Sequence, residues 1–161
     1  MLNISVKITS KKPKVIRRIL SFEGQIIIGD FWETIIVPIK YWTIEDYERQ
    51  WKEGLERLKT HNTSCLVVTA CDKNTGGPFI DWWKLYRIKD MLFIQNGWLM
   101  LEAYQEIVGD KPFTPDTCYN FVEPRETITE AGEKYQNGVY RGLIKYDYFL
   151  HDQQRLNEFI S

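Results

Sequence analysis

The spacing of apolar side chains predicts a chain built mostly of strands around one long helix. Between residues 43 and 60, apolar side chains recur three and four residues apart, which places them on one face of an amphipathic helix. They are Ile44, Tyr47, Trp51, Leu55 and Leu58. Thr43 is expected to cap the first turn, with Asp46 as the acidic residue of a capping box. Trp42 precedes the cap and is expected to pack against Tyr47 as a hydrophobic staple.

Before this helix, the pattern changes to the two-residue alternation of strands. Residues 4–8 alternate apolar and polar side chains and predict a first strand, and residues 15–22 predict a second that ends in a turn at Gly24. Residues 25–39 are largely apolar and extended in character. Gly29-Asp30 in their middle favours either a bulge in one bent strand or the turn of a hairpin.

After the helix, three further strands are expected. The run CLVVTAC at residues 65–71 is short, apolar and rich in β-branched side chains, which favours a buried central strand. Residues 79–88 and 91–95 resemble two antiparallel strands joined at Lys89-Asp90, with Asn96-Gly97 ending the second.

The last third of the chain is less regular. Residues 98–108 predict a short helix, residues 110–134 an irregular, acidic and partly exposed segment, residues 139–146 a last strand and residues 147–160 a terminal helix. The order of strands, helix and strands predicts an α+β fold with a mainly antiparallel twisted sheet, one principal amphipathic helix and one or two short helices. We expect residues 1–161 to form one domain.

Charge is distributed unevenly along the chain, although the net charge is only −1. Residues 1–20 hold six Lys and Arg side chains and no acid, whereas residues 102–133 hold eight acidic side chains and two basic ones. Such asymmetry is typical of a charged partner surface, and solvated charged loops are the alternative interpretation.

The sequence contains few groups suited to catalysis. Phosphate loops, dinucleotide fingerprints, H-E-x-x-H pairs, EF-hand loops and G-x-S-x-G elbows are all absent. His61 follows the principal helix, where the helix dipole favours an imidazolium, so a structural role is expected. We therefore predict a protein that is not an enzyme and has no catalytic, cofactor-binding or metal-binding residues.

Cysteine content and hydropathy indicate the compartment. Cys65, Cys71 and Cys118 are an odd number of well-separated cysteines, which favours buried thiols in a reduced environment over a disulfide framework. The N-terminus lacks the apolar core of a signal peptide, and no apolar run reaches the roughly 18–20 residues of a membrane helix. A cytoplasmic location is expected.

Two adjacent tryptophans, Trp82 and Trp83, are the most notable aromatic feature. Neighbouring residues of a strand point to opposite faces, so the two rings cannot share one side of the sheet. Either both faces are covered, or one ring is an anchor for a partner, since Trp is enriched at interface hot spots.

Five stretches between residues 24 and 134 carry a more specific pattern. They are IIIGDFWETIIVPI, YWTIEDYERQWKEGLERL, SCLVVTACD, PFIDWWKLYRIKDMLFIQN and KPFTPDTCYNFVEPRETITEAGEK. On these stretches the chain resembles the immunity proteins of bacterial contact-dependent growth inhibition (CDI) systems. The C-terminal part diverges, because residues 135–138 read YQNG where such sequences tend to have a Ser-Glu-Trp element.

The resemblance implies a non-enzymatic inhibitor that binds the C-terminal toxin domain of a CDI effector, one to one, and blocks its active site or its access to substrate. Many such toxins are nucleases with basic substrate-binding surfaces, which an inhibitor would meet with carboxylates. The expected toxin-binding residues are Asp110, Asp116, Glu123, Glu126, Glu130 and Glu133, together with Trp82. The expected partner is thus a protein, with no direct contact to nucleic acid or membrane and no cofactor.

Two other classes stay open. A nucleic-acid-binding or adaptor module without catalysis would use the basic residues 11–18, and steep salt dependence of binding to RNA or DNA would reveal it. A hydrolase with an unrecognised carboxylate site would show close carboxylates in a deep polar pocket.

Overall fold

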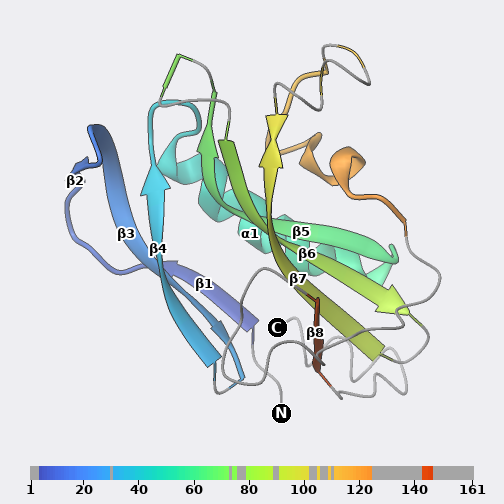
Figure 1. Ribbon diagram of the computed structural model, residues 1–161. Coiled ribbons are helices and arrows are strands. Elements are labelled where there is room, and N and C mark those ends of the chain that lie inside the picture. The colour runs from blue at the N-terminus through green and yellow to red at the C-terminus, as the bar shows by residue number, and fades with distance from the viewer. Residues whose placement is uncertain are drawn as a thin grey trace.

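The protein has an α+β fold in which two antiparallel sheets stand side by side and one long helix packs along the second sheet (Figure 1). The structure is a computed structural model. It describes residues 4–29, 31–72, 74–75, 79–88, 91–101, 105, 109, 111–124 and 143–146. The predicted fold class and antiparallel pairing are confirmed, with two four-stranded sheets in place of one.

The first sheet is organised around its longest strand, β3 (Ile19–Ile28). β4 (Phe31–Pro38) pairs with β3 along one edge, from Ser21 to Ile28. β1 (Ile4–Ile8) and β2 (Lys14–Ile16) pair with successive parts of β3 on its other edge. The stretch 25–39 is therefore a hairpin, which is one of its two predicted interpretations.

Two turns of the first sheet differ from the prediction. Residues 15–22 are not one strand, because the chain reverses at Arg17 and Arg18, whose φ angles are 50° and 69°. Gly24 is not a turn but an interior residue of β3. A Cβ atom there would lie 2.7 Å from the carbonyl oxygen of Lys7 on β1, so the absence of a side chain allows the two strands to approach.

The second sheet has the order β5-β6-β7-β8. Its strands are β5 (Thr63–Cys71), β6 (Phe79–Ile88), β7 (Met91–Met100) and β8 (Leu143–Tyr146). β5 is buried as predicted, but it is an edge strand of this sheet and not a central one.

The C-terminal predictions are met in part. β7 continues through Asn96-Gly97 to Met100, so the predicted helix cannot begin at Trp98; helical conformation is first seen at Leu101. A last strand is present in the predicted stretch and pairs with β7. The predicted terminal helix at 147–160 lies outside the described residues.

Helix α1 (Ile44–Glu56) begins as the sequence predicts and is extended by a 3-10 turn, η1 (Arg57–Lys59). The Asp46 backbone N–H donates to Thr43 Oγ1 at 3.1 Å, and the Thr43 N–H donates to Asp46 Oδ2 at 2.9 Å, which completes the capping box. The rings of Trp42 and Tyr47 lie 5.3 Å apart, as expected of a hydrophobic staple.

The buried face of α1 supplies hydrogen bonds as well as apolar contacts to the outer edge of β5. Gln50 donates from Nε2 to the carbonyl of Cys65 at 2.8 Å and accepts at Oε1 from the N–H of Val67 at 2.9 Å. Trp51 donates from Nε1 to the carbonyl of Val67 at 2.7 Å. Buried backbone groups that lack a neighbouring strand are thus paired with helix side chains.

A register shift in β5 extends this arrangement to a third helix residue. The pairing register with β6 shifts between Val67 and Thr69. After the shift it is Ala70, and not Thr69, whose backbone N–H faces the helix. The Ala70 N–H then donates to the Tyr47 hydroxyl at 2.9 Å. Gly54 completes the contact, because a Cβ atom at this position would overlap the carbonyl oxygen of Cys65.

Residues 111–124, predicted to be a partly exposed loop, contribute a large part of their side chains to the core. Phe113, Cys118, Tyr119 and Phe121 are buried, and the last three belong to a 3-10 turn, η2 (Cys118–Phe121). Phe113 stacks on Trp42 with ring centroids 5.7 Å apart. The prediction of irregular backbone holds apart from this turn, but the segment packs onto the start of α1.

Replacing Gln50 with Leu tests the pairing of the β5 edge. Leu has a similar volume but leaves the Val67 N–H and the Cys65 carbonyl buried without their side-chain partners. We expect the free energy of unfolding to fall by about 2–4 kcal/mol in urea titrations, as two unpaired buried groups should cost. Glu48→Gln on the exposed side of α1 is the control; a similar small change in both variants would contradict the expectation.

Candidate functional site

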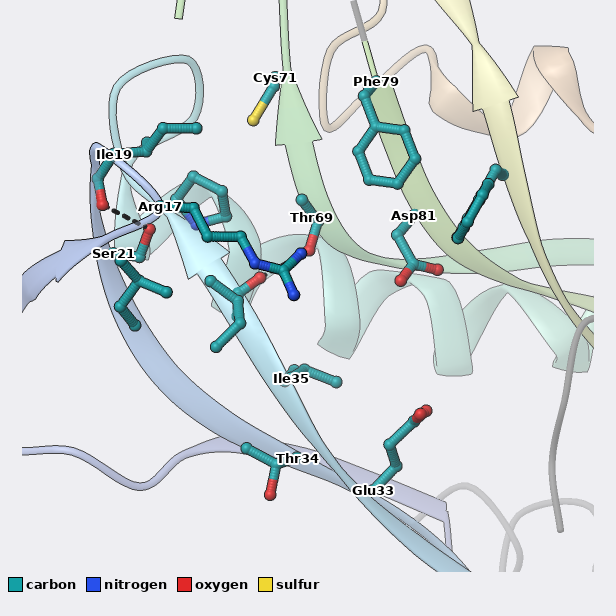
Figure 2. A pocket seen from close by; sticks show the side chains of 14 residues that line it. Arg17, Ile19, Ser21, Glu33, Thr34, Ile35, Thr69, Cys71, Phe79 and Asp81 are labelled. Atoms are coloured by element: carbon teal, nitrogen blue, oxygen red, sulfur yellow. Dashed lines mark hydrogen bonds between the residues drawn. The ribbon is translucent and has the colours of Figure 1, made fainter. Parts of the chain in front are cut away.

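A groove of about 390 Å³ lies where the two sheets meet, beside the tip of the β2–β3 hairpin (Figure 2). Most of its lining residues are apolar. They are Ile16, Arg17, Ile19, Ser21, Glu33, Thr34, Ile35, Ile36, Pro38, Thr69, Cys71, Phe79, Asp81 and Trp98. Thr69 on β5 donates from Oγ1 to the carbonyl of Ile36 on β4 at 2.6 Å, which joins the two sheets beside the groove.

Two carboxylates, one from each sheet, line this groove: Glu33 on β4 and Asp81 on β6 (Figure 2). Asp81 accepts a hydrogen bond from Asn96 Nδ2 at 3.0 Å. Partial burial, with a smaller contribution from the negative charge of Asp81, raises the pKa of Glu33. The guanidinium of Arg17 extends over the groove from the hairpin tip.

Trp98 also lines the groove. Its ring meets that of Phe79 edge-on, with ring centroids 5.4 Å apart, and the residue is 49% exposed. The same ring lines a shallower hollow of about 200 Å³ whose lining includes Glu123. Trp98 therefore borders both the groove and a hollow that is lined by a carboxylate of the acidic segment.

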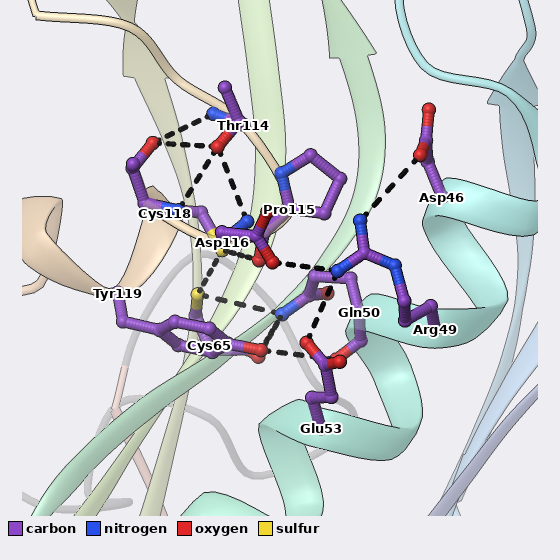
Figure 3. A network of polar contacts seen from close by, with 11 residues as sticks. Asp46, Arg49, Gln50, Glu53, Cys65, Thr114, Pro115, Asp116, Cys118 and Tyr119 are labelled. Carbon is purple, nitrogen blue, oxygen red and sulfur yellow. Dashed lines mark hydrogen bonds and ion pairs between the residues drawn. The ribbon is translucent and has the colours of Figure 1, made fainter.

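A second polar cluster joins the acidic segment to the helix (Figure 3). Arg49 Nη1 lies 2.6 Å from Asp116 Oδ1 and 3.5 Å from Glu53 Oε2, and Arg49 Nη2 lies 3.8 Å from Asp46 Oδ1. The hydrogen bond from Arg49 fixes the direction of the Asp116 carboxylate, which remains exposed to solvent.

Beneath this cluster lies a buried group of polar side chains that suits a structural role. Gln50 donates to the Tyr119 hydroxyl at 3.3 Å, and the sulfur atoms of Cys65 and Cys118 are 3.7 Å apart. Burial raises the pKa of the Tyr119 hydroxyl and of the Cys65 thiol, so both are neutral near pH 7. A neutral, buried thiol is a poor nucleophile.

The predicted toxin-binding residues occupy different environments. Asp116 and Glu123 are exposed, while Asp110, Glu126, Glu130 and Glu133 lie outside the described residues. Trp82 is only 3% exposed and packs edge-on against Phe113 at 5.9 Å. Since Trp83 is also buried, the interpretation in which both faces of the strand are covered applies, and Trp82 offers no exposed ring to a partner.

Three residues of the groove were not predicted from the sequence: Glu33, Asp81 and Trp98. A signal was present for the two acids, because each is a carboxylate within an otherwise largely apolar strand, at FWETIIV and PFIDWW. Their proximity depends on how the two sheets meet, which strand periodicity does not determine.

Within the described part of the chain, no group of three or more His, Cys, Asp and Glu side chains could hold a metal ion. No helix among these residues is long and apolar enough to span a membrane. The groove has two carboxylates, but apolar side chains form most of its lining, which is typical of a binding surface.

Comparison with known proteins gives a consistent set of similarities. The family model described as CdiI N-terminal domain matches residues 37–137. The immunity protein CdiI of Enterobacter cloacae subsp. cloacae is 32% identical over 122 residues, which cover 71% of this chain and 79% of the relative. A chain of the solved CdiA-CT/CdiI toxin and immunity complex from Enterobacter cloacae has the same fold, with a TM-score of 0.66 and 24% identity over 96% of both chains.

Glu33→Gln tests the electrostatics of the groove. Because the pKa of Glu33 is raised, the folded protein holds this proton more tightly than the unfolded chain, and the ionised carboxylate lowers the free energy of unfolding at higher pH. We expect the substitution to stabilise the protein at neutral pH and to have no such effect below the ordinary value of 4.5, where both states are protonated. Thermal melts at both pH values, with Glu48→Gln as control, measure this; lower stability of Glu33→Gln at neutral pH would contradict it.

Proposed function

The chain belongs to the CdiI immunity protein family, and on this basis we propose that it binds and neutralises the toxin domain of a contact-dependent growth inhibition effector. It is the immunity partner of a CdiA-CT/CdiI type of pair, and its partner is a cognate toxin protein. Such neutralisation takes place in the cytoplasm of the protected cell, through a one-to-one complex and without catalysis by this chain.

The target is a nuclease domain with a basic substrate-binding surface. The observation that carries this proposal is the way in which residues 111–124 present carboxylates. Their buried rings, Phe113 and Tyr119, fix the segment against α1, while Asp116 and Glu123 stay exposed. A preorganised acidic surface loses little entropy on binding, and it accelerates association with a basic partner.

The position of the carboxylates also suggests how inhibition works. Side chains that replace the phosphates of a nucleic acid would cover the basic surface that the toxin needs for its substrate. We therefore propose occlusion of the substrate, with Asp110, Asp116, Glu123, Glu126, Glu130 and Glu133 as the toxin-binding carboxylates.

Co-expression with the toxin domain encoded next to this chain tests the function directly. We expect cells that carry both proteins to survive where cells with the toxin alone die, and the purified proteins to form a one-to-one complex. Death of the doubly expressing cells, with no complex by size-exclusion chromatography, would refute the proposal. Salt-dependent binding of RNA or DNA by the isolated chain would instead favour the nucleic-acid-binding alternative.

Reversing one charge of the acidic segment tests the surface. We expect Glu123→Lys to slow association with the toxin roughly tenfold at low ionic strength and to flatten its salt dependence, because charge steering is screened by salt. Glu48→Lys on α1 is the matched control, since it makes the same change outside the segment. Asp116 is less suitable, because its replacement also breaks the contact with Arg49. Equal association rates for both variants would show that Glu123 is not part of the toxin-binding surface.

A further inference from the structure

We propose that Arg49 is a positioning residue for toxin binding, which holds the carboxylate of Asp116 in the direction from which a cationic side chain of the toxin contacts it. In the complex, Asp116 accepts from Arg49 through Oδ1 and from a toxin lysine or arginine through Oδ2. This inference rests on the proposed function, because it takes Asp116 as one of the toxin-binding carboxylates. It adds to that surface a residue of the opposite charge.

The backbone that carries Asp116 is held by hydrogen bonds within its own turn. The Asp116 N–H donates to Thr114 Oγ1 at 3.2 Å, and the Cys118 N–H donates to the Thr114 carbonyl at 2.9 Å. Thr117 Oγ1 accepts from the Thr114 N–H at 2.9 Å and donates to the carbonyl of Pro112 at 2.6 Å. With the backbone held in this way, the carboxylate can still rotate about its side-chain bonds.

Arg49 restricts this rotation from the adjacent helix (Figure 3). Its Nη1 donates to Asp116 Oδ1 at 2.6 Å. The contact uses only one oxygen: in the described part of the chain, Asp116 Oδ2 accepts no hydrogen bond, and the side chain is 70% exposed. A partner can therefore donate to Oδ2 of a carboxylate whose direction is already set, which lowers the entropy lost on binding.

Two further carboxylates hold Arg49 itself in place. Its Nη1 also lies 3.5 Å from Glu53 Oε2, one turn further along α1, and its Nη2 lies 3.8 Å from Asp46 Oδ1. A planar guanidinium presents its donors in a rigid fork, whereas a lysine ammonium is a single point charge on a flexible stem. The direction of the Asp116 carboxylate is thus fixed relative to α1, which in turn is fixed on the second sheet.

The cluster remains negative although a guanidinium lies at its centre. Three carboxylates, those of Asp46, Glu53 and Asp116, surround Arg49, so the four ionised side chains have a net charge of −2. Asp46 already uses its other oxygen to accept from the Thr43 N–H of the capping box. Asp116 is the most exposed of the three carboxylates. A cation of the toxin is attracted to the cluster, and Asp116 is its most accessible acceptor.

The ion pairs of Arg49 contribute little to the stability of the fold. The Arg49 side chain is 43% exposed, and ion pairs between such exposed side chains change the free energy of unfolding only slightly. Buried contacts attach the segment instead, since Phe113 stacks on Trp42 and the Tyr119 hydroxyl accepts from Gln50. Arg49 can therefore be replaced in a folded chain, and an effect on binding can be measured separately from stability.

Replacing Arg49 gives opposite expectations for charge and for position. Arg49→Gln removes a positive charge, so charge steering alone predicts faster association with a basic toxin surface and tighter binding. Loss of the positioning contact predicts weaker binding, because the Asp116 carboxylate must then be ordered in the complex. Lys52→Gln is the matched control, since Lys52 is exposed on the same helix, loses the same charge and is not a partner of Asp116.

We expect Arg49→Gln to bind the toxin domain encoded next to this chain roughly tenfold more weakly than the wild type, through faster dissociation and without slower association. Lys52→Gln should stay within about threefold of the wild type, because it changes charge only. Surface plasmon resonance of the full chains on immobilised toxin domain measures both rate constants, and thermal melts verify folding.

A double-mutant cycle tests whether Arg49 acts through Asp116. Asp116→Asn alone should also weaken binding about tenfold, because it removes the charge that the toxin cation contacts. Arg49→Gln combined with Asp116→Asn should bind no more than about twofold more weakly than Asp116→Asn alone, since the positioning contact has no further effect once the carboxylate is gone.

The outcomes separate the two proposals. Absence of binding by the wild-type chain would refute the proposed function itself. Tight wild-type binding, with Arg49→Gln no weaker than Lys52→Gln, would overturn the inference and leave the immunity function in place. Losses that multiply in the double variant would also overturn it, because Arg49 would then act independently of Asp116. Wild-type affinity of Asp116→Asn would show that this carboxylate is not a toxin contact and that Arg49 has nothing to position.

Discussion

The pairing of the outer edge of β5 by side chains of α1 is the interaction on which the rest of the structure depends. A buried strand edge without a neighbouring strand leaves N–H and carbonyl groups that cost free energy when unpaired. Here Tyr47, Gln50 and Trp51 provide partners for Cys65, Val67 and Ala70. Because hydrogen bonds are directional, they fix the rotation and the height of the helix on the sheet more strictly than apolar contacts alone.

That fixed helix in turn positions the segment that carries the acidic residues. The Tyr41 hydroxyl donates to the carbonyl of Phe113 at 2.8 Å, and the guanidinium of Arg57 lies 4.5 Å from the ring centroid of Tyr119. Gln50 belongs to both systems, since it pairs the β5 edge and also contacts Tyr119. The segment that carries Asp116 is thus connected to the core of the second sheet through Tyr119 and the buried amide of Gln50.

Local signals in the sequence predict the elements, and tertiary contacts explain the differences. Thr43 and Asp46 mark the start of α1 because a capping box uses only adjacent residues. The prediction at Gly24 was wrong because glycine is favoured both in turns and where two strands approach closely. Only the position of the neighbouring Lys7 carbonyl distinguishes the two cases. Arg17-Arg18 has no turn signature in the sequence, so the turn of the first hairpin was predicted at Gly24 and not at these two residues.

The candidate site was less predictable than the fold for the same physical reason. The exposure of Asp116 and Glu123 could be predicted from the local density of charge, because a chain segment rich in acids is expected to be solvated. Yet Phe113 and Tyr119 in that segment are buried, because the start of α1 leaves an apolar surface that periodicity within the segment does not reveal. Glu33 and Asp81 are 48 residues apart in sequence and become neighbours only when the two sheets meet.

Glu33 and Gln50 are both polar residues in partly or fully buried positions, but they affect the stability of the fold in opposite ways. A partly buried carboxylate with a raised pKa beside a second carboxylate does not stabilise the isolated fold, because partial burial, and to a smaller extent the charge of Asp81, favours protonation. The side chain of Gln50 has the opposite character, since its hydrogen bonds to the Cys65 carbonyl and the Val67 N–H satisfy buried backbone groups of β5. Partial burial of an acidic side chain at the junction of the two sheets, in a groove that Trp98 also lines, is therefore not required for the stability of the fold.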